Sequence, residues 1–311
     1  MDLSVVIPCY NEQESLRETH KRVKTACEAA PVNSYEIIFI NDGSRDDTAW
    51  IMDELHTQDK NTVIVDLSRN YGHQIALSAG LQQAQGDYIF VIDADLQDPP
   101  ELLTSMLERA RMPDGPDVVY GQREKRKGET AFKLFTSRAF YKVLSWLSDI
   151  PIPEDVGDFR LMKRRVLDAF LAMPEHQRFI RGMIAWIGFK QEAFLYTRDP
   201  RFAGVTKYPF HKLLQFALDA ISGFSIKPLR VSILFAMIGI AIACLMALVA
   251  VWAHFADRSS TVDGWASLAC LISFFASMQL ICLGVIGEYV GRTYMEVKNR
   301  PLYVLNKVLR H

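Results

Sequence analysis

Cysteine is scarce in this chain, which has 5 cysteines in 311 residues and no C-x-x-C pair. They are scattered, at Cys9, Cys27, Cys244, Cys270 and Cys282. Such spacing supports neither a zinc site nor a disulfide framework. An excess of charge of either sign is also missing, because the net charge is -1 at pH 7. The composition therefore gives no reason to expect nucleic acid as a partner.

Charged side chains are absent from two long stretches near the C-terminus, residues 231–256 and 264–287. Each stretch is longer than the about 20 residues that a helix needs to cross a bilayer. We therefore expect two transmembrane helices joined by an outer loop at 257–263, with a pair of buried core helices as the alternative. Lys and Arg are most frequent after the second stretch, which places both termini in the cytoplasm.

The segment before the first stretch, residues 209–230, has apolar residues at spacings of three and four. This pattern predicts an amphipathic helix. Its apolar face either rests in the headgroup plane of the membrane or packs on the preceding domain. Residues 1–208 are then a cytosolic domain, and residues 288–311 a cytosolic C-terminal tail.

The G-x-G-x-x-G fingerprint of dinucleotide-binding folds is missing after the first apolar run, which disfavours a dinucleotide oxidoreductase. Apolar, β-branched runs lie at 3–7, 36–40, 63–67, 88–92 and 118–120. Helix-like segments alternate with them, at 15–29, 46–56, 74–84 and 101–111. This alternation predicts an α/β domain with a mostly parallel sheet and helices on both faces.

Acidic side chains follow three of the predicted strands. Asp93 and Asp95 come after the fourth run, while Glu12 and Asp42 come after the first and second. Because ligands bind at the carboxyl edge of such sheets, we expect these groups to converge there. Asp93 and Asp95 suit Mg²⁺ or Mn²⁺ carrying a diphosphate, and Glu12 and Asp42 suit a ribose and a base. For Asp42, a turn with an Asp-capped helix is the alternative.

Four motifs together carry a resemblance to a known family: V-V-I-P-C-Y-N-E at 5–12, N-D-G-S at 41–44, D-A-D-L-Q-D-P at 93–99 and G-D-F-R-L-M at 157–162. The combination resembles the family 2 glycosyltransferases of the GT-A fold. Within them it is similar to the polyprenyl-phosphate glycosyltransferases, which include dolichol-phosphate mannose synthases and bactoprenol glucosyltransferases. The resemblance covers nearly the full chain. It implies a Rossmann-like GT-A domain, an interfacial helix and two transmembrane helices.

The resemblance also implies roles for particular residues. It implies metal ligands at Asp93, Asp95 and Gln97. It implies nucleotide-sugar contacts at Pro8, Tyr10, Glu12, Asp42, Asp93, Asp95, Arg201 and Lys207. It implies an acceptor-phosphate site at Arg123, Lys133, Thr136 and Arg138, and catalytic roles for Asp158, Arg201 and Asp95.

Asp158 resembles the residue proposed as catalytic base in that family. A lipid phosphate has a second pKa of about 6, so it is mostly ionised at neutral pH and needs no strong base. We therefore expect Asp158 to orient the acceptor phosphate or the sugar, rather than to remove a proton.

The implied reaction is the inverting transfer of a hexose, glucose in the closest resemblance, from a UDP-sugar to undecaprenyl phosphate. It would need Mg²⁺ or Mn²⁺ and would take place at the cytoplasmic face of a bacterial inner membrane, within a homotetramer. The product would be a lipid-linked sugar for surface glycans such as O-antigen. Alternatives are a GDP-mannose-using mannosyltransferase, a non-catalytic scaffold that senses nucleotide-sugar, and a processive polysaccharide synthase, whose Q-x-x-R-W motif is absent.

Overall fold

The computed structural model describes residues 1–123, 156–197, 227–256 and 265–311 of the chain. The strands are β1 (Leu3–Cys9), β2 (Tyr35–Asn41), β3 (Thr62–Leu67), β4 (Tyr88–Val91), β5 (Val118–Arg123), β6 (Val156–Lys163), β7 (Gln191–Tyr196) and β8 (Leu305–Leu309). The helices are α1 (Leu16–Ala29), α2 (Thr48–Gln58), α3 (His73–Gln83), the short η1 (Pro100–Leu102), α4 (Leu103–Arg111), α6 (Arg164–Leu171), α7 (Ile180–Ile187), α9 (Lys227–Ala256) and α10 (Trp265–Val297). The five strands and four helices predicted for the first 120 residues are all present, with ends shifted by a few residues.

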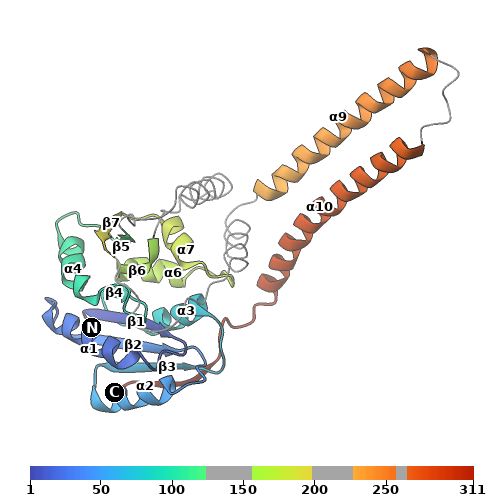
Figure 1. Cartoon of the computed structure of the whole chain (residues 1–311). Coiled ribbons are helices and arrows are strands. Elements are labelled where there is room, and N and C mark those ends of the chain that lie inside the picture. The colour runs from blue at the N-terminus through green and yellow to red at the C-terminus, as the bar shows by residue number, and fades with distance from the viewer. Residues whose placement is uncertain (124–155, 198–226, 257–264) are drawn as a thin grey trace. The chain divides into compact units, whose positions relative to one another are not determined.

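The described strands form one sheet in the order β7-β5-β6-β4-β1-β2-β3-β8 (Figure 1). The pairs of β1 with β2, β1 with β4, β2 with β3 and β5 with β7 are parallel. β6 and β8 pair antiparallel with their neighbours. The mostly parallel α/β sheet expected from the sequence is therefore confirmed.

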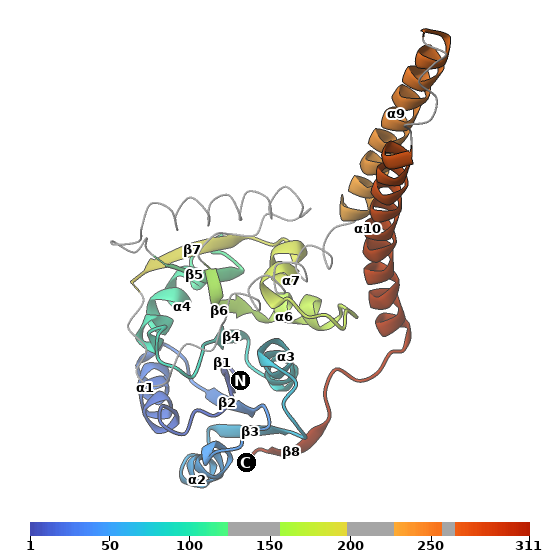
Figure 2. The same cartoon turned by 45° about the vertical axis from the view of Figure 1, so that its right-hand side comes forward.

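Helices cover both faces of this sheet, and for this reason its central strands are buried and mostly apolar. α1, α2 and α4 lie over one face, and α3, α6 and α7 lie over the other (Figure 2). Every residue of β1 and β3 is buried, as expected for strands covered on both sides. α3 packs especially close, because a Cβ on its Gly80 would lie 2.4 Å from the side chain of Ile40 and 2.6 Å from that of Val6. Glycine at position 80 thus brings α3 down onto the sheet.

The chain returns to the sheet at its C-terminal end. β8 pairs antiparallel with β3 and covers that edge of the sheet (Figure 2). Arg310 follows β8 and forms an ion pair with the buried carboxylate of Glu36. The prediction treated residues 288–311 as a cytosolic tail. The structure adds that α10 continues to Val297 and that residues 305–309 belong to the same sheet as the strands of the first domain.

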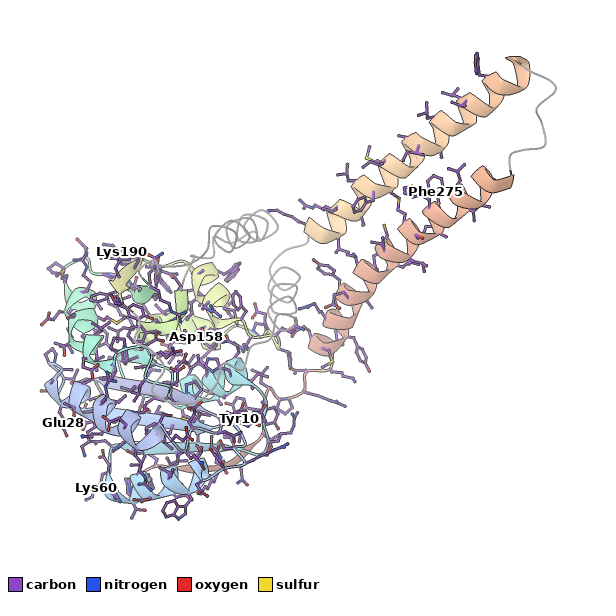
Figure 3. All side chains as sticks on the ribbon, in the orientation of Figure 1. Tyr10, Glu28, Lys60, Asp158, Lys190 and Phe275 are labelled. Atoms are coloured by element: carbon purple, nitrogen blue, oxygen red, sulfur yellow. The ribbon has the colours of Figure 1, made fainter. Side chains whose placement is uncertain are left out.

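α9 and α10 belong to a second compact unit. The two helices contact each other at Gly239 of α9 (Figure 3). A Cβ at this position would come within 3.2 Å of both Phe275 and Met278 of α10, so glycine permits the close approach. Among the described residues, one stretch, Phe274–Val297, is long and apolar enough to cross a membrane, with a mean hydropathy of 1.5. A shorter apolar stretch, Leu229–Leu245, lies in α9. The prediction of two transmembrane helices stays a prediction.

Two predicted segments fall largely or wholly outside the described residues. These are the juxtamembrane helix 209–230, of which only 227–230 are described as the start of α9, and the outer loop 257–263.

Candidate active site

The site lies at the carboxyl edge of the parallel strands. Tyr10 follows β1 and Asp158 lies near the start of the antiparallel β6, so both reach this edge. Figure 3 shows them on the side of the sheet away from Glu28 and Lys60, which lie at the opposite ends of neighbouring elements. The convergence expected from the sequence thus has a structural basis.

The loop after β4 presents Asp93 toward other acidic groups. Asp93 Oδ1 is buried and accepts no hydrogen bond from the described part of the chain. Burial raises the pKa of Asp93 to about 6, and the negative charges of Asp158, Asp98 and Asp95 act in the same direction. Leu96 has a φ of 56° and is buried, which turns the chain sharply between Asp95 and Gln97. Asp93 Oδ1 is thus a buried carboxylate oxygen that no hydrogen bond from the described residues satisfies.

His73, the first residue of α3, bridges two of these carboxylates. Its Nε2 lies 3.1 Å from Asp158 Oδ2 and 3.6 Å from Asp93 Oδ1. Burial works against the imidazolium form. The hydrogen bond to Asp158 and the charge of Asp93 nevertheless raise the pKa of His73 to about 9. His73 therefore carries a positive charge at neutral pH and links the loop after β4 to β6.

Asp158 is held from several sides. Gln74 Nε2 donates to its Oδ2 over 2.8 Å, and Arg181 Nε lies 3.3 Å from its Oδ1. Burial opposes ionisation of this carboxyl, but His73, Arg181 and Arg160 together hold its pKa well below its usual range. The Asp158 side chain is 7% exposed, so the carboxylate has a fixed position at the margin of the site.

The same side chains join neighbouring elements. Gln74 Oε1 accepts from the backbone N–H of Ile180, which ties α3 to α7. Arg181 donates to the carbonyl of Val156, and Arg160 donates to the carbonyls of Gly157 and Asp158. These bonds fix the backbone on either side of Asp158.

Asp42 has a structural task in this arrangement. Its two carboxylate oxygens accept from the backbone N–H groups of Tyr71, at 2.7 Å, and Gly72, at 2.9 Å. Gly72 is the N-cap of α3, so Asp42 holds the loop that delivers His73. Burial raises the pKa of Asp42, and these two hydrogen bonds oppose the shift. Contact with a nucleoside stays a prediction for this residue.

The loops after β1 and β2 interlock beside it. The backbone N–H of Asn11 donates to Ser44 Oγ at 3.1 Å, and that of Glu12 donates to Thr48 Oγ1 at 2.8 Å. Asn11 has a φ of 54°, a left-handed conformation that asparagine tolerates better than most residues. This turn sets Tyr10 and Glu12 at the carboxyl edge, after the buried Pro8 of β1. The two loops are thereby a rigid pair.

Arg123, the last residue of β5, lies beside Gly157, the residue before Asp158. Its Nη2 is the atom that a Cβ on Gly157 would approach to 3.0 Å. Five other predicted site residues fall outside the described residues: Lys133, Thr136, Arg138, Arg201 and Lys207.

Comparison with known proteins identifies the family. A family model described as glycosyl transferase family 2 matches residues 4–171, which include all three strand ends and Asp158. The chain belongs to glycosyltransferase family 2. It is 46% identical over 305 residues to the uncharacterized glycosyltransferase YkcC of Bacillus subtilis, covering 98% of this chain and 93% of that one.

Two further relatives have more specific names. The SfII prophage-derived bactoprenol glucosyl transferase of Shigella flexneri is 39% identical over 309 residues, covering 99% of this chain and 98% of that one. The prophage bactoprenol glucosyl transferase homolog of Escherichia coli K12 is 39% identical over 312 residues, covering 99% of each. This protein is therefore a glycosyltransferase whose similarity to these relatives extends beyond the family 2 match.

The family resemblance implies a divalent metal, and the described residues fit one if the substrate supplies some of its ligands. No group of three or more His, Cys, Asp or Glu among them could by itself hold an ion. Asp93 and Asp95 nevertheless supply hard oxygen ligands, and the buried Asp93 Oδ1 accepts no hydrogen bond within the described chain. Mg²⁺ is commonly bound by one or two carboxylates together with substrate phosphates. The residues fit an ion that arrives with a diphosphate.

Sequence reasoning missed four side chains of this site: His73, Gln74, Arg160 and Arg181. A signal for the first two was available, because the polar run S-R-N-Y-G-H-Q at 68–74 follows the third strand. It ends at the same edge as the acidic runs after the other strands. Arg160 lies within the G-D-F-R-L-M motif at 157–162, but its bonds to the carbonyls of Gly157 and Asp158 needed the folded β6 to be seen. Arg181 gave no comparable signal, since its position depends on how α7 folds back.

Proposed function

We propose that this glycosyltransferase moves a hexose, glucose by resemblance, from a UDP-sugar to undecaprenyl phosphate at the cytoplasmic face of the bacterial inner membrane. The observation that supports the proposal most strongly is how much of the chain is similar to its named relatives. The match to two proteins named as bactoprenol glucosyl transferases or their homologue covers 99% of the chain, so it includes α9, α10 and β8. A likeness confined to the nucleotide-binding half would not favour one acceptor over another.

The second unit supports a membrane location. Apolar side chains of α9 and α10 are broadly exposed, among them Leu248 at 68%, Leu280 at 69% and Val290 at 61%. Soluble proteins rarely expose contiguous apolar surface on this scale, whereas acyl chains would cover it. We propose that α9 and α10 both cross the bilayer, with the catalytic domain and both termini in the cytoplasm.

The proposed reaction is a single displacement. An oxygen of the acceptor phosphate forms a bond to the anomeric carbon as the bond to the UDP oxygen breaks. The UDP leaves with the electron pair, and the configuration inverts. A bound Mg²⁺ or Mn²⁺ would offset the charge that grows on the leaving diphosphate. Asp93, Asp95 and Gln97 would hold that ion, and Arg201 and Lys207 would add positive charge.

The residues around Asp158 are suited to orienting reactants. Asp158 is fixed by His73, Gln74 and Arg181, so its carboxylate offers a rigid acceptor for a sugar hydroxyl. Rigid placement of reacting groups lowers a barrier without proton transfer. Because the acceptor phosphate is mostly ionised at neutral pH, a positioning role for Asp158 is sufficient.

The direct test is transfer by the purified full-length enzyme. It would be incubated with radiolabelled UDP-glucose, undecaprenyl phosphate and Mg²⁺ or Mn²⁺, and the organic phase would be analysed for a lipid-linked sugar. Parallel reactions with other UDP-sugars and with GDP-mannose define the donor. A labelled polymer would indicate a processive synthase, and no product with any donor would indicate a non-catalytic scaffold.

The assembly needs a separate measurement. The resemblance implies a homotetramer, which light scattering of the detergent-solubilised protein would check.

A further inference from the structure

Tyr196 belongs to none of the sequence motifs and has no role in the proposed mechanism. It is the last residue of β7 and lies opposite Arg123 in the parallel register with β5. Tyr196 is 5% exposed, and the centroid of its ring lies 5.3 Å from that of Phe159 on β6. Tyr196 is thus buried at the end of its strand, with its ring packed among apolar core residues.

The hydroxyl of Tyr196 joins two parts of the site. It donates to Asp98 Oδ1, and it accepts from the Arg123 guanidinium. Asp98 is 1% exposed and ends the acidic loop that begins at Asp93. A hydroxyl has one donor and two acceptor positions, so both contacts can be made at once. One oxygen atom therefore connects the loop of the predicted metal ligands with the predicted acceptor arginine.

Arg123 is confined on its other side by Gly157. Its Nη2 occupies space that a Cβ at position 157 would approach to 3.0 Å. Its Nε is buried and has no hydrogen-bond partner among the described residues. A buried guanidinium N–H without an acceptor is costly, and an oxygen of a ligand would satisfy it. The guanidinium is thus held between Tyr196 and Gly157, and its Nε–H can donate a hydrogen bond to a ligand.

We propose that Tyr196 is a positioning residue that sets the Arg123 guanidinium for the acceptor phosphate and, through Asp98, couples it to the donor loop. The inference rests on the proposed function, because it takes the phosphate of a polyprenyl phosphate as the ligand of Arg123. Tyr196 does not touch the reacting atoms. Its hydroxyl acts through Arg123, and its ring packs in the core.

Replacement of Tyr196 by Phe separates these two contributions, because it keeps the ring and removes the hydroxyl. We expect Tyr196→Phe to raise the KM for undecaprenyl phosphate about tenfold, the effect of losing one charge-assisted hydrogen bond. The KM for the UDP-sugar should change less than twofold. Tyr88→Phe is the matched control, since Tyr88 lies at the opposite end of β4, and both of its KM values should equal those of the wild type.

Two further variants test whether the effect runs through Arg123. Gly157→Ala would push Nη2 from the other side and should also raise the acceptor KM selectively, even if Tyr196→Phe folds poorly. In an Arg123→Met background, Tyr196→Phe should add less than twofold, because the group that it positions is gone. Full additivity of the two changes, or an equal rise in both KM values, would overturn the inference.

Binding distinguishes this inference from the proposed function. Calorimetry with a short-chain polyprenyl phosphate should show about tenfold weaker binding to Tyr196→Phe than to the wild type. Absence of lipid-linked product from the wild type, with this binding difference intact, would count against the proposed reaction alone. Equal binding by both proteins, or none by the wild type, would refute the role of Tyr196.

Discussion

The strand at the C-terminal end provides a stability prediction that can be worked from its contacts. We consider Arg310→Met, which removes a positive charge while keeping much of the side-chain volume. Arg310 forms an ion pair with Glu36 Oε2 and donates to the carbonyl of Gln83 over 2.7 Å. Glu36 is 2% exposed, and its Oε1 accepts from Ser4 and from the backbone N–H of Gln85. The variant leaves a buried carboxylate without its cation.

The magnitude follows from the burial of the two partners. Removal of one member of a fully buried pair costs about 3–5 kcal/mol. The Arg310 side chain is 26% exposed, and Glu36 keeps its two other donors. We therefore lower the expected loss to about 2–3 kcal/mol. For a domain of this size, 1 kcal/mol moves the unfolding midpoint by about 2–4 °C, so we expect a fall of about 4–12 °C.

The assay is thermal unfolding of the purified full-length protein in detergent, followed by near-UV circular dichroism at one fixed heating rate. Lys307→Met is the matched control, because Lys307 is on the same strand and binds Asp53 at 2.8 Å. These two side chains are 39% and 46% exposed, so this pair contributes about 1 kcal/mol at most. A midpoint for Arg310→Met no lower than that for Lys307→Met would refute the reasoning.

Three other predictions concern the active edge. Asp93→Asn should lower the rate of sugar transfer at least about hundredfold, whereas the exposed control Asp114→Asn should retain the wild-type rate in the same assay. Chelation with EDTA should abolish transfer, and added Mg²⁺ or Mn²⁺ should restore it; full activity after dialysis against the chelator would contradict the metal requirement. Gln74→Leu removes a donor to Asp158 and should lower kcat about tenfold or more with little change in the KM for the donor, as steady-state kinetics would show. A rise in KM alone would mean that Gln74 contributes to binding instead.

The alternation of apolar runs was enough to predict the first five strands and the helices between them. Each run has a local signal, since strands covered on both faces are mostly apolar along their length. β8 was missed because its five residues form a strand only by pairing with β3, more than 230 positions earlier in the chain. A pairing of that kind is decided by tertiary contacts, and local propensity gives little sign of it.

The candidate site shows the same division. The acidic residues after β1, β2 and β4 could be placed at one edge from topology alone. Their links to the rest of the site could not, because His73 binds both Asp93 and Asp158, and Asp158 lies 85 positions from His73 in the chain. Asp42 is the most instructive case. The sequence predicted a carboxylate near the nucleoside, and the structure shows both of its oxygens bound to the loop before α3.

The position that Asp42 gives to His73 affects the ionisation of Asp158. Asp42 fixes Gly72, the N-cap of α3, and so helps to place His73 between Asp93 and Asp158. A general base needs a lone pair directed at the proton that it removes. Asp158 Oδ2 accepts from His73 and Gln74, and its Oδ1 faces the cation of Arg181. Positive neighbours on both oxygens favour the ionised carboxylate and weaken it as a base. This arrangement favours orientation of reactants over proton removal. In the proposed reaction, the charge on the leaving diphosphate is then the main charge that the site would have to stabilise.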